Sequence, residues 1–271
     1  SHVDRSINGS KIFFETNVLE TLNLLDTCKN YYEELSNNEK NNFKFIHIST
    51  DEVYGSLKES DKAFSEKNKY MPNNPYAASK ASSDHLVRSY NKTFNLPTII
   101  SNCSNNYGPF QYPEKLIPLT ILNALENKNL PIYGEGNQIR DWLHVNDHCS
   151  AIRTILTKGL SSETYNIGGS NELRNIEVVK IICNHLDIIK PRQNGLMYSE
   201  LIKHISDRPG HDSRYAIDAS KIKSELGWTP TVKFENGILD TISWYMENNE
   251  WVNGIKTKSY DSWISQNYDK R

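Results

Sequence analysis

Apolar and polar residues follow a regular order over the first part of the chain. Apolar side chains recur at helical spacing within residues 10–35, and residues 76–94 repeat that pattern. Short β-branched runs lie between and after these helices and predict buried strands. Strands that alternate with helices indicate an α/β fold with a doubly wound parallel sheet. The expected order is helix 10–35, loop 36–42, strand 45–49, loop 57–74, helix 76–94 and strand 96–101.

The pattern becomes mixed after residue 113, where short strands and helices follow one another without a single period. We expect residues 1–113 to hold most of the sheet, and residues 114–271 to form a smaller C-terminal α+β lobe with some segments returning to the sheet. Trp244 and Tyr245 are expected core residues. The expected elements are helices 116–124, 150–157, 176–186, 219–226 and 234–246, strands 131–133, 140–145 and 165–169, and a turn at 207–211.

Composition and charge narrow the class of protein. The chain has 271 residues and a formal net charge of −2, and its lysines and arginines do not form the basic stripe of a nucleic-acid-binding protein. Its apolar runs are far shorter than a membrane span. Four widely spaced cysteines, and no signal-peptide pattern after Ser1, predict reduced thiols in a cytoplasmic protein. We therefore expect neither a nucleic-acid nor a membrane partner.

Groups that can move protons gather where the first predicted strand ends. Thr50, Asp51 and Glu52 follow that strand, at the edge where open α/β sheets bind ligands. Tyr76 and Lys80 lie one turn apart on the next helix, and an ammonium eases proton loss from a phenol because it favours the phenolate. Each feature alone has a simpler explanation, since the first three residues could form a helix N-cap and a lone Tyr-x-x-x-Lys often marks a solvated helix face. Together they predict an acid–base site.

The two adjacent carboxylates place a condition on the local backbone. Consecutive strand residues point to opposite faces, so Asp51 and Glu52 can reach one ligand only if the chain leaves strand geometry at about Thr50. Two carboxylates close together split in proton affinity, which gives one acid and one base. The sequence alone does not decide which residue takes which role.

Five segments carry a resemblance to a known family. They are HISTDEVYG at 47–55, PYAASKASSD at 75–84, NCSNNYGP at 102–109, QIRDWLHV at 138–145 and DRPGHD at 207–212. With them the chain resembles the nucleoside-diphosphate-glucose 4,6-dehydratases, which act on dTDP- or UDP-glucose and belong to the extended short-chain dehydrogenase/reductase family. The likeness runs from the first residue almost to the C-terminus.

The resemblance implies a Rossmann-like dinucleotide-binding domain, of which residues 1–113 form the C-terminal part. Residues 114–271 would then form mainly the nucleotide-sugar-binding lobe. The glycine-rich fingerprint that cradles the pyrophosphate of NAD in this family is absent, together with its N-terminal βαβ units. The chain alone is therefore not expected to hold NAD normally. That absence also leaves open a binding module without a cofactor.

The family's reaction assigns a role to each residue of the acid–base site. It converts a nucleoside-diphosphate-glucose to the 4-keto-6-deoxy sugar, and NAD is a tightly held cofactor that is not consumed. Tyr76, assisted by Lys80, would take the proton of the 4-hydroxyl, to which Thr50 would hydrogen-bond. Glu52 would remove the C5 proton, and Asp51 would protonate the departing 6-hydroxyl. The alternative is a nucleotide-sugar 4-epimerase, which usually carries small hydroxyl residues in place of the two acids.

The resemblance also implies ligands for the cofactor and the substrate. Tyr76, Lys80, Thr16 and Asn106 would face NAD. The substrate ligands would be Ser1, Thr50, Asn105, Glu114, Lys115, Pro131, Ile132, Tyr133, Arg140, Asn175, Asp207, Arg208, Pro209, Gly210 and His211.

Two of these ligand assignments have an alternative. Guanidinium groups pair well with phosphate oxygens, so Arg140 and Arg208 suit a diphosphate. Without the motifs, surface ion pairs with Asp141 and Asp207 would be the simpler expectation.

No metal site is expected. His144 and His148 have the spacing of a helical ligand pair, but no third ligand follows at a suitable distance in the sequence.

A homodimer is implied by the resemblance. Helices 10–35 and 76–94 of each subunit would pack together in a symmetric contact. That contact would bury Leu22 and Leu25, or the surface near His85 and Ser89.

Overall fold

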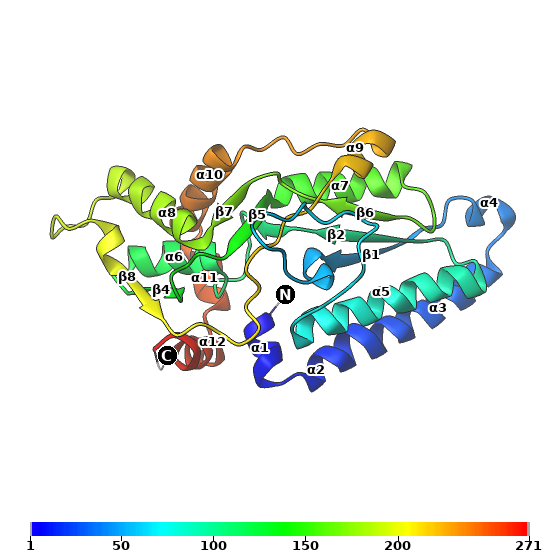
Figure 1. Ribbon diagram of the computed structural model, residues 1–271, viewed down its shortest axis with the longest axis horizontal. Helices are drawn as coiled ribbons and strands as arrows, with labels where there is room; N and C mark the ends of the chain where they lie inside the picture. Colours follow the sequence, from blue (N-terminus) through cyan, green and yellow to red (C-terminus); the bar gives the residue numbers. More distant parts are fainter. Residues whose placement is uncertain (1, 270–271) are drawn as a thin grey trace. The chain divides into compact units, whose positions relative to one another are not determined.

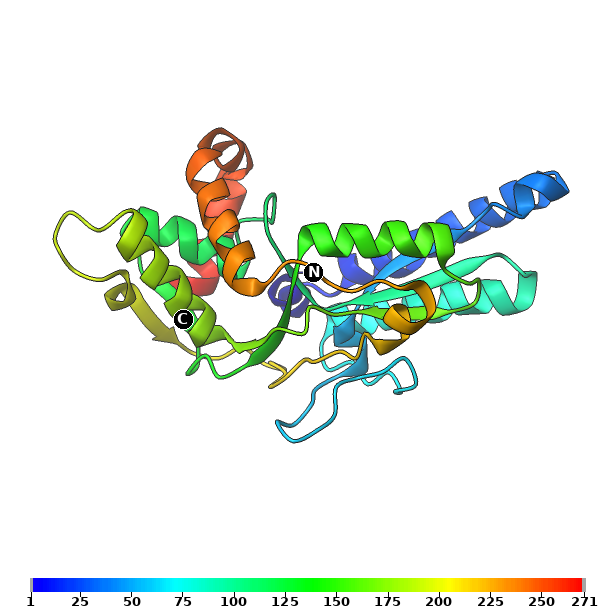
Figure 2. The same cartoon turned by 90° about the horizontal axis from the view of Figure 1, so that it is seen from above.

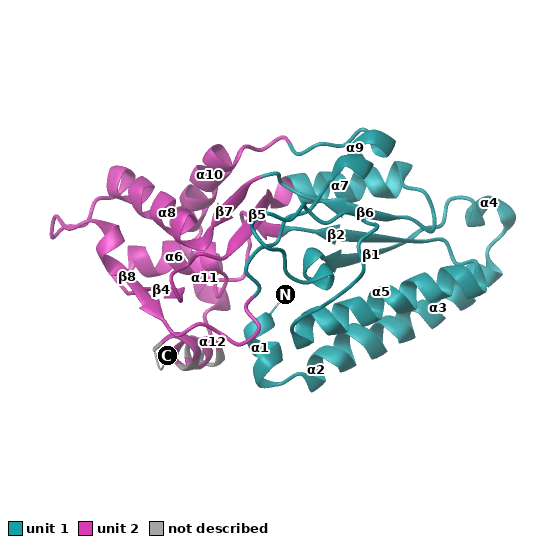
Figure 3. Cartoon of the chain, in the orientation of Figure 1, with its two compact units in different colours: residues 1–104, 147–170, 212–230 teal, residues 105–146, 171–211, 231–271 magenta. Residues whose placement is uncertain are grey.

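The computed structural model describes residues 2–269, and the chain divides into two compact units (Figure 3). The first unit comprises residues up to 104 together with 147–170 and 212–230. The second comprises residues 105–146, 171–211 and 231 onward. Two later segments therefore return to the first unit. The division falls at residues 104 and 105, somewhat before the expected boundary after residue 113.

The first unit is built on a parallel sheet. Strand β1 (Phe45–Thr50) pairs with β2 (Thr98–Cys103), which pairs with β6 (Thr164–Ile167), giving the order β1-β2-β6. All three strands were predicted, with ends shifted by a few residues. In this register Thr50 lies beside Cys103, so the carboxyl ends of β1 and β2 meet at one edge of the sheet. The residues that follow β1 therefore stand at that edge.

Helices cover both faces of this sheet (Figure 1). Helix α5 (Pro75–Phe94) packs on β1 and β2, and α3 (Glu20–Glu34) packs on α5. Helices α7 (Val145–Lys158) and α9 (Ser220–Leu226) lie on the other side of the sheet, as the view turned by 90° also shows (Figure 2). This three-layer arrangement is the α/β fold that the sequence predicts.

Local sequence explains where α5 begins and ends. The side chain of Asn74 accepts a hydrogen bond from Ala77 N at 2.8 Å and caps the helix, and Pro75 occupies its first position. An asparagine N-cap followed by proline satisfies one free N–H and removes another. The helix ends at Asn95, which adopts a left-handed conformation with φ 56°.

The apolar face of α5 packs against α3 and the sheet. Leu25 and Val87 are fully buried there, with Tyr90, Leu96 and Ile100. Because Leu25 is buried within the chain itself, the expectation that it is buried between two subunits is wrong. Its neighbour Leu22 is only partly buried.

The N-terminal helices differ in detail from the prediction. The helix expected at 10–35 consists of α2 (Lys11–Phe14), a π-helical turn (Glu15–Leu19) and α3 in unbroken succession. Helix α1 (Val3–Asn8) precedes it and was not predicted.

The loop expected at 36–42 contains a short helix, α4 (Asn37–Lys40), so that expectation is wrong. Ser36 caps α4, and Glu39 Oε2 accepts a hydrogen bond from Ser36 N at 2.9 Å, which completes a capping box. The Ser-x-x-Glu pattern of a capping box was present in the sequence, but the polar residues around it led to the prediction of a loop.

The second unit combines short strands and amphipathic helices. β3 pairs parallel with β5 and β5 antiparallel with β7, while β4 pairs parallel with β8. The strands are β3 (Asn105–Tyr107), β4 (Leu130–Tyr133), β5 (Ile139–His144), β7 (Glu172–Arg174) and β8 (Ile202–Ile205), and the helices are α6 (Leu116–Leu125), α8 (Asn175–Ile189), α10 (Phe234–Glu247), α11 (Asn249–Ile255) and α12 (Lys258–Ile264).

The core of the second unit lies between α6, α8 and α10. Tyr245 of α10 is fully buried there, as predicted. Trp244 is only partly buried, and its ring packs against Phe110 and Trp251. Strands β3, β7 and β8, of three or four residues each, were not predicted. Over residues 2–269, no helix has both the length and the apolar character needed to cross a bilayer.

Candidate active site

The chain turns sharply where β1 ends. Thr50 is the last strand residue, and residues 51–54 form a 3₁₀ turn (Asp51–Tyr54). The Thr50 hydroxyl caps this turn by accepting a hydrogen bond from Glu52 N at 3.3 Å. The chain therefore leaves strand geometry after Thr50, as was expected if Asp51 and Glu52 are to reach one ligand. The two alternatives considered for this segment, a helix N-cap and an acid–base site, are therefore compatible with each other.

Both carboxylates of the turn are buried. Asp51 is 2% exposed and Glu52 is 8% exposed. The Thr50 hydroxyl lies 3.3 Å from Asp51 Oδ1, and Asn74 Nδ2 donates to Glu52 Oε2 at 3.4 Å. Carboxylates in a site that excludes water differ readily in proton affinity, which suits a division into acid and base.

Tyr76 is packed against this turn. Its backbone N–H donates to Ser6 Oγ at 3.1 Å, and its ring lies edge-on to Phe13 with centroids 6.3 Å apart. The Tyr76 hydroxyl is hydrogen-bonded to the side chain of Thr50. The structure thus brings together Thr50, Tyr76 and the two carboxylates.

The electrostatic environment of Tyr76 opposes its ionisation. Burial raises the pKa of Tyr76 well above its ordinary value, and the charge of Glu52 raises it further. Cys103 and Asp51 act in the same direction. The expected lowering by Lys80 does not prevail, because these effects are larger. A phenol in such a site needs a fixed positive charge nearby to become a base at neutral pH.

Lys80, on the next turn of α5, is the predicted source of that positive charge. Its Nζ donates to the carbonyl oxygen of Ile48 at 2.8 Å, which fixes the amine against β1. Burial lowers the pKa of Lys80, and the charge of Asp84 partly offsets this effect.

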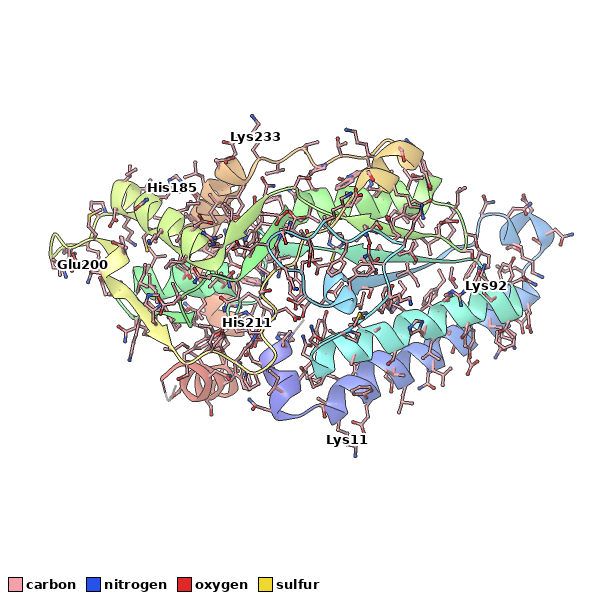
Figure 4. The ribbon with its side chains drawn as sticks, viewed as in Figure 1. Lys11, Lys92, His185, Glu200, His211 and Lys233 are labelled. Carbon is pink, nitrogen blue, oxygen red and sulfur yellow. The ribbon has the colours of Figure 1, made fainter. Side chains whose placement is uncertain are left out.

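A second group of predicted residues gathers in the turn after β8. Asp207 Oδ1 lies 2.6 Å from His211 Nδ1 and accepts a hydrogen bond from Arg208 N at 2.7 Å. Gln138 Nε2 donates to the other oxygen of Asp207 at 2.8 Å. Figure 4 labels His211 on the segment that follows β8. The carboxylate therefore organises the turn.

Two guanidinium groups lie near His211 in this turn. Burial lowers the pKa of His211 to about 4, with further lowering by the guanidinium groups of Arg208 and Arg140. Arg140 is 4% exposed, so its assignment to a surface ion pair is wrong. Asp141 instead accepts a hydrogen bond from Asn171 N at 2.8 Å. A neutral imidazole beside two guanidinium groups suits an anionic ligand such as a diphosphate.

Aromatic rings extend the same region of the second unit. The Tyr133 ring lies 5.8 Å from that of His211, and the Arg208 guanidinium lies 5.9 Å from the Tyr133 ring. Pro131 and Tyr133 are half-buried on β4, whereas Ile132 between them is 2% exposed and belongs to the core. The side chain of Ile132 is therefore not available as a ligand, because strand residues alternate between the faces.

The structure places the remaining predicted residues as follows. Glu114 Oε1 lies 3.9 Å from Lys115 Nζ at the start of α6. Asn105 lies on β3, and the carbonyl of Asn106 accepts a hydrogen bond from Gln111 Nε2 at 2.8 Å. The three other predicted ligands are Asn175, which begins α8, and Pro209 and Gly210, which lie in the turn after β8.

Two of the predicted residues contribute less to the described site. Thr16 lies in the π-helical turn with its side chain exposed. Its neighbour Asn17 instead contacts α5, donating to Ser79 Oγ at 2.9 Å. Ser1 lies outside the described residues.

Sequence reasoning missed two residues of these sites. Asn74 both caps α5 and holds Glu52, and the Asn-Pro pair at a helix start was a usable signal for its capping role. The ring of Tyr268 lies 5.8 Å from that of Tyr133 and is inclined to it by 33°. No local pattern marks Tyr268, because its partner is far away in the sequence.

Comparison with known proteins assigns the family. The sequence profile described as "GDP-mannose 4,6 dehydratase" matches residues 1–241. The dTDP-glucose 4,6-dehydratase of Escherichia coli is 56% identical over 279 aligned positions, which cover all of this chain and 77% of that protein. The chain belongs to the nucleotide-sugar 4,6-dehydratases. They are NAD-dependent hydro-lyases of the extended short-chain dehydrogenase/reductase family.

Further relatives agree with this assignment. The dTDP-glucose 4,6-dehydratase of Xanthomonas campestris is 55% identical over 96% of this chain and 74% of that protein. One similar solved structure is the crystal structure of DesIV, a dTDP-glucose 4,6-dehydratase of Streptomyces venezuelae, with NAD and TYD bound. It superposes on this chain with a TM-score of 0.84 at 42% sequence identity, and the match covers 94% of this chain and 73% of the DesIV chain. The UDP-glucuronic acid 4-epimerase of Bacillus cereus is more distant, with a TM-score of 0.72 at 28% identity over 85% of this chain and 67% of that one.

Proposed function

We propose that this dehydratase acts on dTDP-glucose and that Thr50, Asp51, Glu52, Tyr76 and Lys80 carry out the reaction. The observation that carries the proposal is the capped 3₁₀ turn, which holds two buried carboxylates beside Tyr76. An acid, a base and a phenol in one water-excluded site match a reaction that first oxidises a hydroxyl and then eliminates water.

The first half of the reaction belongs to Tyr76. Its hydroxyl, linked to Thr50, takes the proton of the sugar 4-hydroxyl. NAD, when bound, supplies the hydride acceptor at C4, and the donor groups of Tyr76 and Lys80 at the carboxyl edge of a parallel sheet fit its nicotinamide end. Thr16 and Asn106 complete the proposed cofactor contacts.

The second half belongs to the two carboxylates. A ketone at C4 makes the neighbouring C5 hydrogen acidic, and Glu52 removes it. Asp51 protonates the departing 6-hydroxyl so that water leaves. Return of the hydride to C6 and of a proton to C5 would then give the 4-keto-6-deoxy sugar and leave NAD unchanged overall. The hydrogen bond from Asn74 to Glu52 orients the base, and Asp51 is buried in the same turn.

The second unit recognises the nucleotide in this proposal. Arg140, Arg208 and His211 bind the diphosphate, and Pro131, Tyr133 and Tyr268 line the base and sugar. The remaining proposed ligands are Asn105, Glu114, Lys115, Asn175, Asp207, Pro209 and Gly210. The similarity to enzymes that are named for dTDP-glucose favours thymine over uracil.

A nucleotide-sugar 4-epimerase remains the second candidate, supported by a structural likeness at 28% identity. It would use Tyr76 and Lys80 but has no need of two buried acids after β1. Those acids therefore favour the dehydratase.

The test is conversion of substrate by the full-length protein. Incubation with dTDP-glucose and, separately, with UDP-glucose should give a product lighter by one water from dTDP-glucose, detected by mass spectrometry. Tyr76→Phe serves as the inactive control. A product of unchanged mass but altered stereochemistry would establish the epimerase instead, and no reaction with either sugar nucleotide while NAD is bound would refute both.

A homodimer and a cytoplasmic location are also proposed. Apolar side chains are exposed along the N-terminal helices, at Ile12 on α2, at Leu19 in the π-helical turn, and at Leu24 and Tyr31 on α3. An apolar helical stripe of this kind is typical of a subunit contact.

A further inference from the structure

Behind Lys80 lies a buried polar cluster that the reaction does not use directly. It consists of His47 on β1 with Ser83 and Asp84 on α5, and it includes Ser49 at the end of β1. Asp84 is 1% exposed, the lowest value of any carboxylate near the site. Burying a carboxylate is costly unless it has compensating charges and hydrogen bonds. Its presence therefore calls for an explanation.

The cluster contacts Lys80 through the imidazole of His47. The Nε2 atom of His47 lies 3.4 Å from Lys80 Nζ and 3.2 Å from Asp84 Oδ1. The same atom lies 3.2 Å from Ser83 Oγ, which donates its own proton to the Lys80 carbonyl at 2.8 Å. The imidazole of His47 therefore stands between the Asp84 carboxylate and the Lys80 amine, next to Ser83 of α5.

The carboxylate has a second fixed contact. Ser49 Oγ donates to Asp84 Oδ2 at 2.8 Å, so that each oxygen of Asp84 faces a group from β1. Asp84 also follows Lys80 by one helical turn, which places the two side chains on the same face of α5. In a site of low polarity, a negative charge at this position acts strongly on a nearby ammonium.

We propose that Asp84 is a positioning residue whose negative charge, next to His47, preserves the positive charge of the Lys80 amine. The inference rests on the proposed function, because the positive charge of Lys80 affects the reaction only if Tyr76 must ionise. Burial, Glu52 and Asp51 all oppose ionisation of Tyr76. Burial also favours the neutral form of Lys80, and Asp84 opposes that effect.

Other titratable groups face this cluster. Tyr54 and Tyr70 lie near Asp84, and burial raises the pKa of both phenols, so they remain neutral at working pH. The groups that face Lys80 or Asp84 are His47 from β1, Cys103 from β2, Tyr76 from α5, Tyr54 from the 3₁₀ turn and Tyr70 from the following loop.

The test replaces Asp84 by asparagine, which keeps the shape and removes the charge. The matched control is Ser49→Ala, which removes a hydrogen bond to the same carboxylate and keeps its charge. Both variants are made in the full-length protein, and their folding is checked by circular dichroism and thermal melting.

Two measurements then report on Lys80. The first is the pH dependence of bound NADH formation after mixing with dTDP-glucose. In Asp84→Asn the loss of activity at high pH should begin about 0.5–1 pH unit lower, an additional loss of about 2–5-fold at the pH of the wild-type midpoint, with KM unchanged. The second is reductive methylation of Lys80 without substrate, followed by peptide mass spectrometry. Its amine should become reactive at correspondingly lower pH.

The outcomes separate the possibilities. Ser49→Ala should follow the wild-type pH dependence in both measurements. If Asp84→Asn follows it as well, or if both variants shift equally, the proposal is overturned. If Asp84→Asn does not fold, Asp84→Ser, which also removes the charge, takes its place with the same expected shift, and the wild-type pH dependence in that variant would overturn the proposal. If the wild type forms no NADH, the proposed function fails, while methylation still tests the coupling of Asp84 to Lys80.

Discussion

Replacing Glu52 by glutamine should separate oxidation from elimination. The glutamine side chain has nearly the same shape, and its carbonyl oxygen can keep the contact with Asn74 Nδ2, which now measures 3.4 Å. The exchange therefore removes a proton acceptor and a charge without opening a cavity. General acid–base groups contribute roughly 10²–10⁴-fold, which corresponds to about 3–5 kcal/mol of transition-state stabilisation. We expect a loss of this size in the overall rate.

The oxidation step should respond in the opposite direction. After burial, Glu52 is the largest cause of the raised pKa of Tyr76. Removing its charge lowers the pKa of Tyr76, so a larger fraction of the phenol is ionised at any pH below that value. Enzyme-bound NADH should therefore form at least as fast as in the wild type, and its formation should extend to lower pH.

The assay combines rapid-mixing absorbance of bound NADH with exchange of deuterium from solvent at C5. Glu52→Gln should form NADH with little exchange, whereas Asp51→Asn should form NADH and exchange at C5 without losing water. If Glu52→Gln exchanges at the wild-type rate while Asp51→Asn does not exchange, the two roles are reversed. If neither variant forms NADH, both carboxylates serve binding or oxidation, and the elimination mechanism is wrong.

Three further predictions concern stability and assembly. Gly237→Ala should lower the free energy of unfolding, measured by urea denaturation, by about 1–3 kcal/mol, because the added Cβ would overlap the hydroxyl of Tyr107. The control Gly254→Ala should not destabilise the protein, since no atom lies within 4 Å of its added Cβ. Burial lowers the pKa of His148 from 6.5 to about 4. As the pH falls, His148 therefore takes up a proton in the unfolded chain before it does so in the folded chain, and the free energy of unfolding should fall between about pH 6.5 and 4. A leucine in place of His148 should reduce that dependence, and an unchanged dependence would refute the assignment. Leu24→Asp should give monomers in sedimentation, while Leu160→Asp on another surface should not; a dimer in both would exclude the α3 contact.

Local sequence predicted the elements that carry the first site and the residues that lie there. Helical and strand periods identified β1, α5 and β2 because each is long enough to show its pattern. The spacing of Tyr76 and Lys80 placed them on one face of α5. The adjacency of Asp51 and Glu52 required a turn after Thr50, and the turn is there. These features depend on neighbouring residues, so the local sequence contains the information.

Only the tertiary structure decided which distant residues meet. His47 and Asp84 lie on different elements, and no local pattern indicates that one imidazole nitrogen links Asp84 to Lys80. The pairing of the Tyr268 and Tyr133 rings is likewise a contact between remote segments. The direction of the Tyr76 pKa also required the structure, because burial and opposing charges depend on how strands and helices pack. Local sequence fixes backbone geometry, but packing between remote segments sets the environment in which each group titrates.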